Sequence, residues 1–304
     1  MSSWLRLSEA YAQSGKQAAA LKTLARAQEL EPTNWVVTYL TGDVHSQLSS
    51  HAEAIACFEE VLATRPTEVG VLVSLSRTLV AQAREQSVSG YHTRAEASLL
   101  GALAATWTVL DSSSGFGTLV WKNVGDACIY LAQLAHSFNG GRIATAVGPF
   151  VQRLVADDRS GQSSVADVVS VRQLVKTPAA VDASYLLKLA ICAYACRDNL
   201  LMGDDKLAAA SLHDIAIALH HLAGSLSFSQ KALQSACVRQ ATAYVRSALR
   251  FRPKDEQLWT TLGTIVFESS PNLSQHAFIM ALEINPKVRD RLQSPGSSTL
   301  SHAS

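Results

Sequence analysis

Apolar and small residues recur along the first 32 positions at the three- and four-residue spacing of a helix face. Ser14-Gly15 follows the first run and ends a helix there, because glycine readily adopts the left-handed conformation of a helix end. Pro32 stops the second run, since proline cannot continue a helix. The pattern predicts two antiparallel helices whose small residues allow close approach, while Trp4, Tyr11 and Leu24 fill the space around them. The two faces consist of Trp4, Leu7, Ser8 and Tyr11, and of Ala20, Leu24 and Ala27.

The same pattern returns 34 residues later and again after a further 34. In the third copy the second helix arrives seven residues late, and we expect the polar stretch Glu85–His92 to form a loop that holds the insertion. A further copy lies near the C-terminus. A period of 34 with this pattern resembles the tetratricopeptide repeat. The matching positions are Gly42, Ala54, Phe58, Val61 and Pro66 in the second copy, and Trp259, Leu262, Gly263, Val266, Phe278, Ala281 and Pro286 near the C-terminus.

The repeats predict an all-α fold, a solenoid in which antiparallel helix pairs form a right-handed superhelix. Residues 1–110 are expected to form three repeats, and residues 212–288 two C-terminal helical repeats. Between them, residues 111–211 break the period and are expected to form irregular helical hairpins that continue the stack. The valine-rich Val165–Val175 is compatible with helix or strand, and residues 289–304 are expected to be a disordered tail. Helices in the irregular part are predicted at Leu119–Ser137, Ile143–Ala156, Val181–Asp198 and Lys206–Leu222.

Charge and cysteine usage narrow the class of protein. The 26 Lys and Arg residues balance 25 Asp and Glu, and a net charge of +1 disfavours a broad basic surface for nucleic acid or anionic lipid. Five cysteines in apolar surroundings indicate buried free thiols in a reducing compartment. The sequence shows no secretory leader, and Leu99–Leu110 is too short to span a bilayer. We therefore expect a protein without a membrane association that is cytoplasmic, or also nuclear.

No group of residues forms a recognisable catalytic, cofactor or metal motif. Cys192 and Cys196 share a helix face but lack a second pair at zinc spacing. His220-His221 and His213 are not on one face, and Gly115-Phe-Gly117 lacks the third glycine of a phosphate-binding turn. The sequence therefore predicts a protein that is not an enzyme and binds no cofactor or metal. An enzyme with its site among the irregular helices is the least favoured alternative.

Three stretches resemble the tetratricopeptide scaffold subunits of superkiller complexes: Trp4–Trp35, Asp111–Leu134 and Leu273–Lys287. The second is the most specific, because its serine-rich break, Gly115-Phe116 and Trp121-Lys122 are not part of the repeat motif. The resemblance implies a cytoplasmic scaffold that holds an RNA helicase and a β-propeller subunit and assists the exosome in 3′-to-5′ mRNA decay. Members of that family are several times longer, so we expect a fragment or truncated form. The alternative is a generic tetratricopeptide interaction module of another assembly.

The resemblance also implies a partner-binding concave face. Glu9 stands near the position where co-chaperone tetratricopeptide domains hold a C-terminal carboxylate, and its charge would repel that group. The competing interpretation is that Leu5, Val36 and Phe267 simply pack on neighbouring helices. The expected face comprises Ser2, Leu5, Glu9, Gln13, Val36, Tyr39, Asp43 and Gln47 in the first two repeats, and Thr260, Thr264, Phe267 and Glu268 in the last.

The densest basic cluster has two interpretations. Arg246, Arg250, Arg252 and Lys254 surround Phe251, a combination that can hold phosphate and stack a base. Cations are also favourable at the C-terminus of a helix, and Pro253 marks such an end. The balanced net charge favours the second interpretation, so we expect protein partners and no direct contact with nucleic acid.

Overall fold

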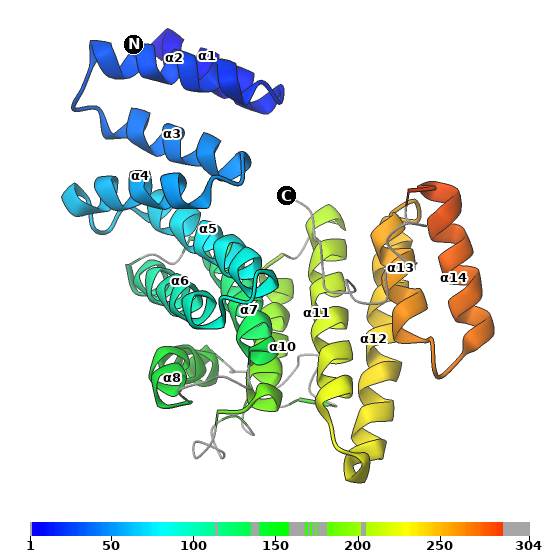
Figure 1. Cartoon of the computed structure of the whole chain (residues 1–304). Coiled ribbons are helices and arrows are strands. Elements are labelled where there is room, and N and C mark those ends of the chain that lie inside the picture. The colour runs from blue at the N-terminus through cyan, green and yellow to red at the C-terminus, as the bar shows by residue number, and fades with distance from the viewer. Residues whose placement is uncertain are drawn as a thin grey trace. The chain divides into compact units, whose positions relative to one another are not determined.

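The structure is a computed structural model that describes residues 2–112, 115–134, 140–157, 168–169, 171, 174, 181–201 and 205–287. Within these ranges every regular element is helical and no strand occurs, as the repeat pattern predicts (Figure 1). The chain divides into two compact units, residues 1–149 and 150–304. Helix α8 (Gly140–Asp157) contains the boundary between them.

The first unit is a series of helical hairpins. Each hairpin packs on the next, because α2 contacts α3, α4 contacts α5 and α6 contacts α7. Gly15 ends the first helix with a φ of 71°, as the sequence predicts. The helices are α1 (Ser2–Gln13), α2 (Gln17–Leu30), α3 (Trp35–Gln47), α4 (His51–Thr64), α5 (Val69–Val88), α6 (His92–Ser112) and α7 (Gly117–Gln133).

The core of the first hairpin follows the predicted small and large positions, with one exception. Ala20, Leu24 and Ala27 of α2 are buried in one cluster with Val37 and Val44 of α3. Trp4, expected to fill this space, is instead 37% exposed. Leu72, at the matching position of α5, is only 5% exposed, because α4 packs against α5. Within the described residues, no helix packs against α1 in the way that α4 packs against α5.

The predicted loop at Glu85–His92 is wrong. Helix α5 continues through these polar residues to Val88, and α6 begins at His92. Only Gly90, with a φ of 82°, adopts a conformation that most residues avoid. The seven-residue insertion therefore lengthens helix instead of loop, because α5 has 20 residues where α3 has 13. Helix α6 is also seven residues longer than α4, 21 against 14, but its extra residues lie at its C-terminal end and are not part of this insertion.

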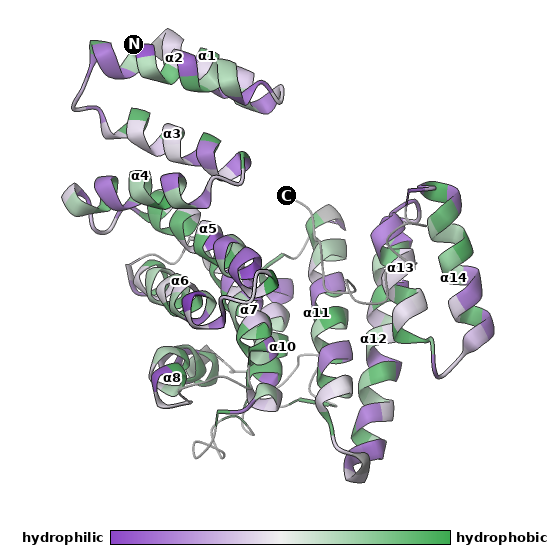
Figure 2. Ribbon diagram, in the orientation of Figure 1, coloured by the Kyte–Doolittle hydropathy of each residue, from purple (hydrophilic) through white to green (hydrophobic). Residues whose placement is uncertain are grey.

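The second unit continues with α-helices of 10 to 21 residues. Its elements are α10 (Ala183–Leu200), α11 (Asp205–Ser225), a short 3-10 helix at Phe228–Gln230, α12 (Lys231–Phe251), α13 (Glu256–Ile265) and α14 (Pro271–Ile284). Each helix contacts the next from α10 to α14. Hydrophobic and hydrophilic residues both occur along α11, α12, α13 and α14 (Figure 2). Arg197 and Asp214, whose charged atoms are 2.6 Å apart, form a largely buried ion pair between α10 and α11.

The predicted helices of the irregular part agree with α7, α8, α10 and α11 to within a few residues. The domain boundary expected at position 211 falls inside α11. Residues 289–304, predicted to be disordered, lie outside the described residues, as does most of Val165–Val175.

The five cysteines are free thiols. Cys128, Cys192 and Cys237 are buried, whereas Cys57 and Cys196 are partly exposed. Burial raises the pKa of Cys128 to about 12 and that of Cys237 to about 11, so both thiols stay protonated and unreactive at neutral pH. Among the described helices, none combines the length and apolar character needed to cross a bilayer.

Candidate partner-binding groove

A hollow of about 260 Å³ lies between α1 and α3. The 34-residue register creates it, because equivalent positions of successive first helices lie side by side in the stack. Glu9 and Asp43 are one such pair, and Gln13 and Gln47 are another. The lining residues are Ser8, Glu9, Ala12 and Gln13 from α1, and Tyr39, Leu40, Asp43, Val44 and Gln47 from α3.

Polar contacts extend this face from α3 to α5. Asp43 Oδ1 lies 3.3 Å from a guanidinium nitrogen of Arg77, and Gln47 Nε2 donates to Asp43 Oδ2 at 2.9 Å. The hydroxyls of Tyr39 and Ser74 are 3.4 Å apart. These contacts link polar side chains of α3 and α5, and they leave the Asp43 charge partly neutralised by Arg77.

Five of the eight residues predicted in the first two repeats line this hollow: Glu9, Gln13, Tyr39, Asp43 and Gln47. Leu5 instead packs against the core cluster of the first hairpin, and Val36 is half-buried. The side chain of Ser2 lies outside the description. Sequence reasoning missed Arg77, although adding 34 to Asp43 gives its position.

The four predicted residues of the last repeat belong to the second unit. Thr260 and Thr264 direct their hydroxyls to carbonyls of their own helix, those of Glu256 and Thr260, at 2.8 and 3.0 Å. Phe267 is 65% exposed and Glu268 is exposed. The hydroxyls of Thr260 and Thr264 are thus engaged within α13. Phe267 and Glu268 offer an apolar and an acidic group just after the end of that helix.

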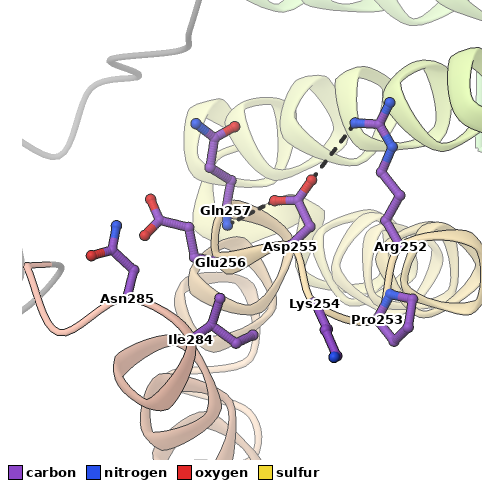
Figure 3. Close-up of a pocket in the computed structure, with 8 residues that line it drawn as sticks. All are labelled: Arg252, Pro253, Lys254, Asp255, Glu256, Gln257, Ile284 and Asn285. Atoms are coloured by element: carbon purple, nitrogen blue, oxygen red, sulfur yellow. Dashed lines mark hydrogen bonds and ion pairs between the residues drawn. The ribbon is translucent and has the colours of Figure 1, made fainter.

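A second, larger hollow of about 820 Å³ lies at the connection between α12 and α13, beside the end of α14 (Figure 3). Asp255 caps α13 there: its Oδ1 accepts the backbone N–H of Gln257 at 3.0 Å and that of Leu258 at 3.4 Å. Its other oxygen lies 3.7 Å from Arg252. These contacts stabilise the start of α13.

Histidines and cysteines do not assemble into a metal site anywhere in the described ranges, where no group of three or more His, Cys, Asp or Glu is placed to hold an ion. His213 Nε2 is within 2.8 Å of the Thr261 hydroxyl, which ties α11 to α13. Burial lowers the pKa of His220, and burial together with His220 lowers the pKa of His221 to about 4. Both side chains are therefore neutral at physiological pH.

Comparison with known proteins identifies the repeat. Residues 2–34, which form α1, α2 and their turn, match the family profile described as tetratricopeptide repeat. The chain has the tetratricopeptide-repeat fold. The hollow thus lies between the first helix of this matched repeat and the first helix of the hairpin that follows it.

The resemblance expected from three short stretches is confirmed over most of the chain. It is 26% identical over 270 residues to Superkiller protein 3 of Schizosaccharomyces pombe. The similarity covers 86% of this chain but only 18% of that relative. The chain therefore corresponds to a small part of the relative's length.

Proposed function

We propose that the chain is a non-catalytic scaffold segment whose groove between α1 and α3 binds a segment of a protein partner. The supporting observation is the hollow itself, where the polar residues expected from the repeat register come together. Tetratricopeptide solenoids bind partners through such faces, because stacked repeats present one continuous surface.

The groove chemistry restricts the occupant. Glu9 is exposed and no basic residue lines the hollow, so a terminal carboxylate would be repelled. Gln13 offers an amide that can pair with a peptide backbone, while Leu40 and Ala12 supply apolar contact. We propose an internal, neutral or basic peptide segment as the occupant.

We further propose that the assembly is a superkiller-like complex, in which the chain organises an RNA helicase, a β-propeller subunit and the exosome for 3′-to-5′ mRNA decay in the cytoplasm. The support is the similarity to Superkiller protein 3 over 86% of the chain. Because the chain spans 18% of that relative, this segment would carry only a part of such an assembly.

A generic tetratricopeptide module of another assembly is the second candidate. The observation that favours it is the match of residues 2–34 to the general repeat profile, which carries no information on the partner. The groove chemistry is the same under both candidates, and only the identity of the captured proteins separates them.

Affinity purification of the tagged chain from eukaryotic cells, with mass spectrometry of captured proteins, tests both the binding groove and the superkiller-like assembly. Helicase, propeller or exosome subunits are expected, and their loss is expected in a Glu9→Lys, Asp43→Lys variant. Glu59→Lys, Glu60→Lys makes the same charge change on exposed residues of α4 and serves as the control.

Capture of other proteins that the groove variant loses would support the generic module and overturn the superkiller assignment. Equal capture by the wild-type chain and both variants would overturn the groove itself. Cell fractionation of the tagged chain checks the cytoplasmic location.

A further inference from the structure

Helix α12 and the loop that follows it are strongly basic, although the whole chain is nearly neutral. Residues 231–254 contain six of the 26 Lys and Arg residues and none of the 25 Asp and Glu residues. The remainder of the chain holds the other 20 Lys and Arg residues and all 25 Asp and Glu residues, so it is net acidic. The basic excess is therefore a local property of this helix.

Three of these cations form a line on the side of α12 that faces away from the core. Arg239, Arg246 and Arg250 are all exposed. At 100° per residue they lie within about 40° of one another around the helix axis. The buried residues Cys237, Ala241, Val245 and Ala248 lie on the opposite side. We call this line of three arginines the basic ridge.

The arginines of the basic ridge are not used by the fold. Within the described part of the chain, Arg239, Arg246 and Arg250 form no ion pair and no hydrogen bond through their side chains, in contrast to Arg197 and Arg252. A favourable interaction with the helix end extends only over the last turn. It accounts for Arg250, the one cation there, and leaves the other two unexplained.

Small residues separate the arginines. Ala232, Ser235 and Ala243 occupy the remaining exposed positions of the same side. With such short side chains between the cations, a partner backbone can come close to α12 while its acidic side chains reach the guanidinium groups. Arginine suits that arrangement, because its planar group binds a carboxylate through two parallel hydrogen bonds.

We propose that the basic ridge docks an acidic helix of a protein partner. Arg239 and Arg246 are about 10 Å apart along the axis, and Arg246 and Arg250 about 6 Å. An acidic helix with carboxylates at the same seven- and four-residue spacing matches these distances. Single-stranded nucleic acid fits less well, since it requires aromatic stacking platforms and the ridge has none. Phe251, the nearest exposed aromatic residue, lies about 100° around the helix from Arg250.

This surface belongs to the second unit, and the groove between α1 and α3 belongs to the first. The two proposals therefore stand or fall separately.

The test is binding of a fluorescent synthetic helix that carries glutamates at i, i+4, i+7 and i+11, measured by anisotropy. We expect saturable binding that weakens with salt, because exposed charge pairs are screened. Arg239→Gln, Arg246→Gln, Arg250→Gln should weaken it about tenfold or more. The control variant Arg6→Gln, Lys16→Gln, Lys22→Gln removes three exposed cations from the first unit and should bind like wild type.

Equal weakening by the control would show attraction to net charge alone and overturn the proposal. A 20-nucleotide single-stranded RNA that binds more tightly and displaces the peptide would overturn it in favour of a nucleic-acid surface. Circular dichroism checks that each variant folds. If the triple variant is unstable, a charge swap replaces it: Arg246→Glu is combined with a peptide in which one glutamate is changed to lysine. The expected result is that the swapped pair binds again. Failure of the swap to restore binding would contradict the ridge.

Discussion

The ring of Phe278 lies across Gly263 so closely that a Cβ on the glycine would be 2.7 Å from Cε1 of the ring. Gly42 and Phe58 repeat the relationship in the first unit, where the same distance would be 2.8 Å. In both hairpins the first helix thus presents bare backbone to an aromatic ring of the second. The glycine at this place in the repeat is required by space, since neither residue has a positive φ.

Gly42→Ala and Gly263→Ala are expected to destabilise the protein. Overpacking a well-filled interface typically costs about 1–3 kcal/mol, which exceeds the gain of about 1 kcal/mol that alanine brings to a helix. Gly70→Ala is the control, because a Cβ there meets nothing within 4 Å. Urea unfolding should show lower midpoints for the first two variants only. A Phe278→Leu change should offset part of the Gly263→Ala loss, and additive effects would contradict direct contact.

Asp214→Ala is expected to reduce the free energy of unfolding by about 3–5 kcal/mol, since it leaves the largely buried Arg197 charge without its partner. Asp43→Ala breaks the Asp43–Arg77 pair, whose arginine is 63% exposed, and should cost at most about 1 kcal/mol. Denaturant titration of both variants measures the difference. Similar losses in the two would show that burial does not set the strength of these pairs.

The neutral histidine pair of α11 predicts a dependence of stability on pH. Above pH 6.5, His221 is neutral in the folded and unfolded chain. Between pH 6.5 and about 4, the unfolded chain binds a proton that the folded protein does not, so the free energy of unfolding falls as pH falls. The shift corresponds to a loss of about 3 kcal/mol by pH 4. The lowered pKa of His220 acts in the same direction.

His221→Gln should therefore lose less stability than wild type between pH 7 and pH 5, as followed by urea midpoints at each pH. His92→Gln removes an exposed histidine and serves as the control. The same slope in the wild type and in His221→Gln would assign the acid sensitivity to other groups.

The sequence predicts the fold well where periodic residues define it. Ala54 and Phe58 are fully buried at their expected places, because interior packing selects side-chain size position by position. The loop at Glu85–His92 was predicted wrongly for a physical reason: polar residues favour exposure without breaking a helix. Helix α5 ends only near Gly90, which has a positive φ. Trp4 shows a similar limit, since its burial depends on a neighbour that its own hairpin does not contain.

The candidate site could be predicted only in part. Register alone places Glu9 beside Asp43, because both occupy one position of the repeat. It does not show that Arg77 neutralises Asp43, which depends on the rotamers of long side chains. The basic ridge could not be predicted from the sequence, because Arg239 is distant in sequence from the cluster at 246–254. Only the burial of the opposite side of α12 shows which of these cations share a surface.

The seven residues by which α5 exceeds α3 have a rotational consequence. Seven residues turn a helix by about 700°, only some 20° short of two full revolutions. The apolar stripe of the longer helix therefore returns to the same direction after the extra turns. An insertion of five residues would rotate everything beyond it by about 140° and point its apolar positions at water. The length of an insertion into these hairpins is thus restricted. Insertions close to a whole number of helical turns keep the apolar residues facing the neighbouring helices, and insertions of intermediate length turn them away.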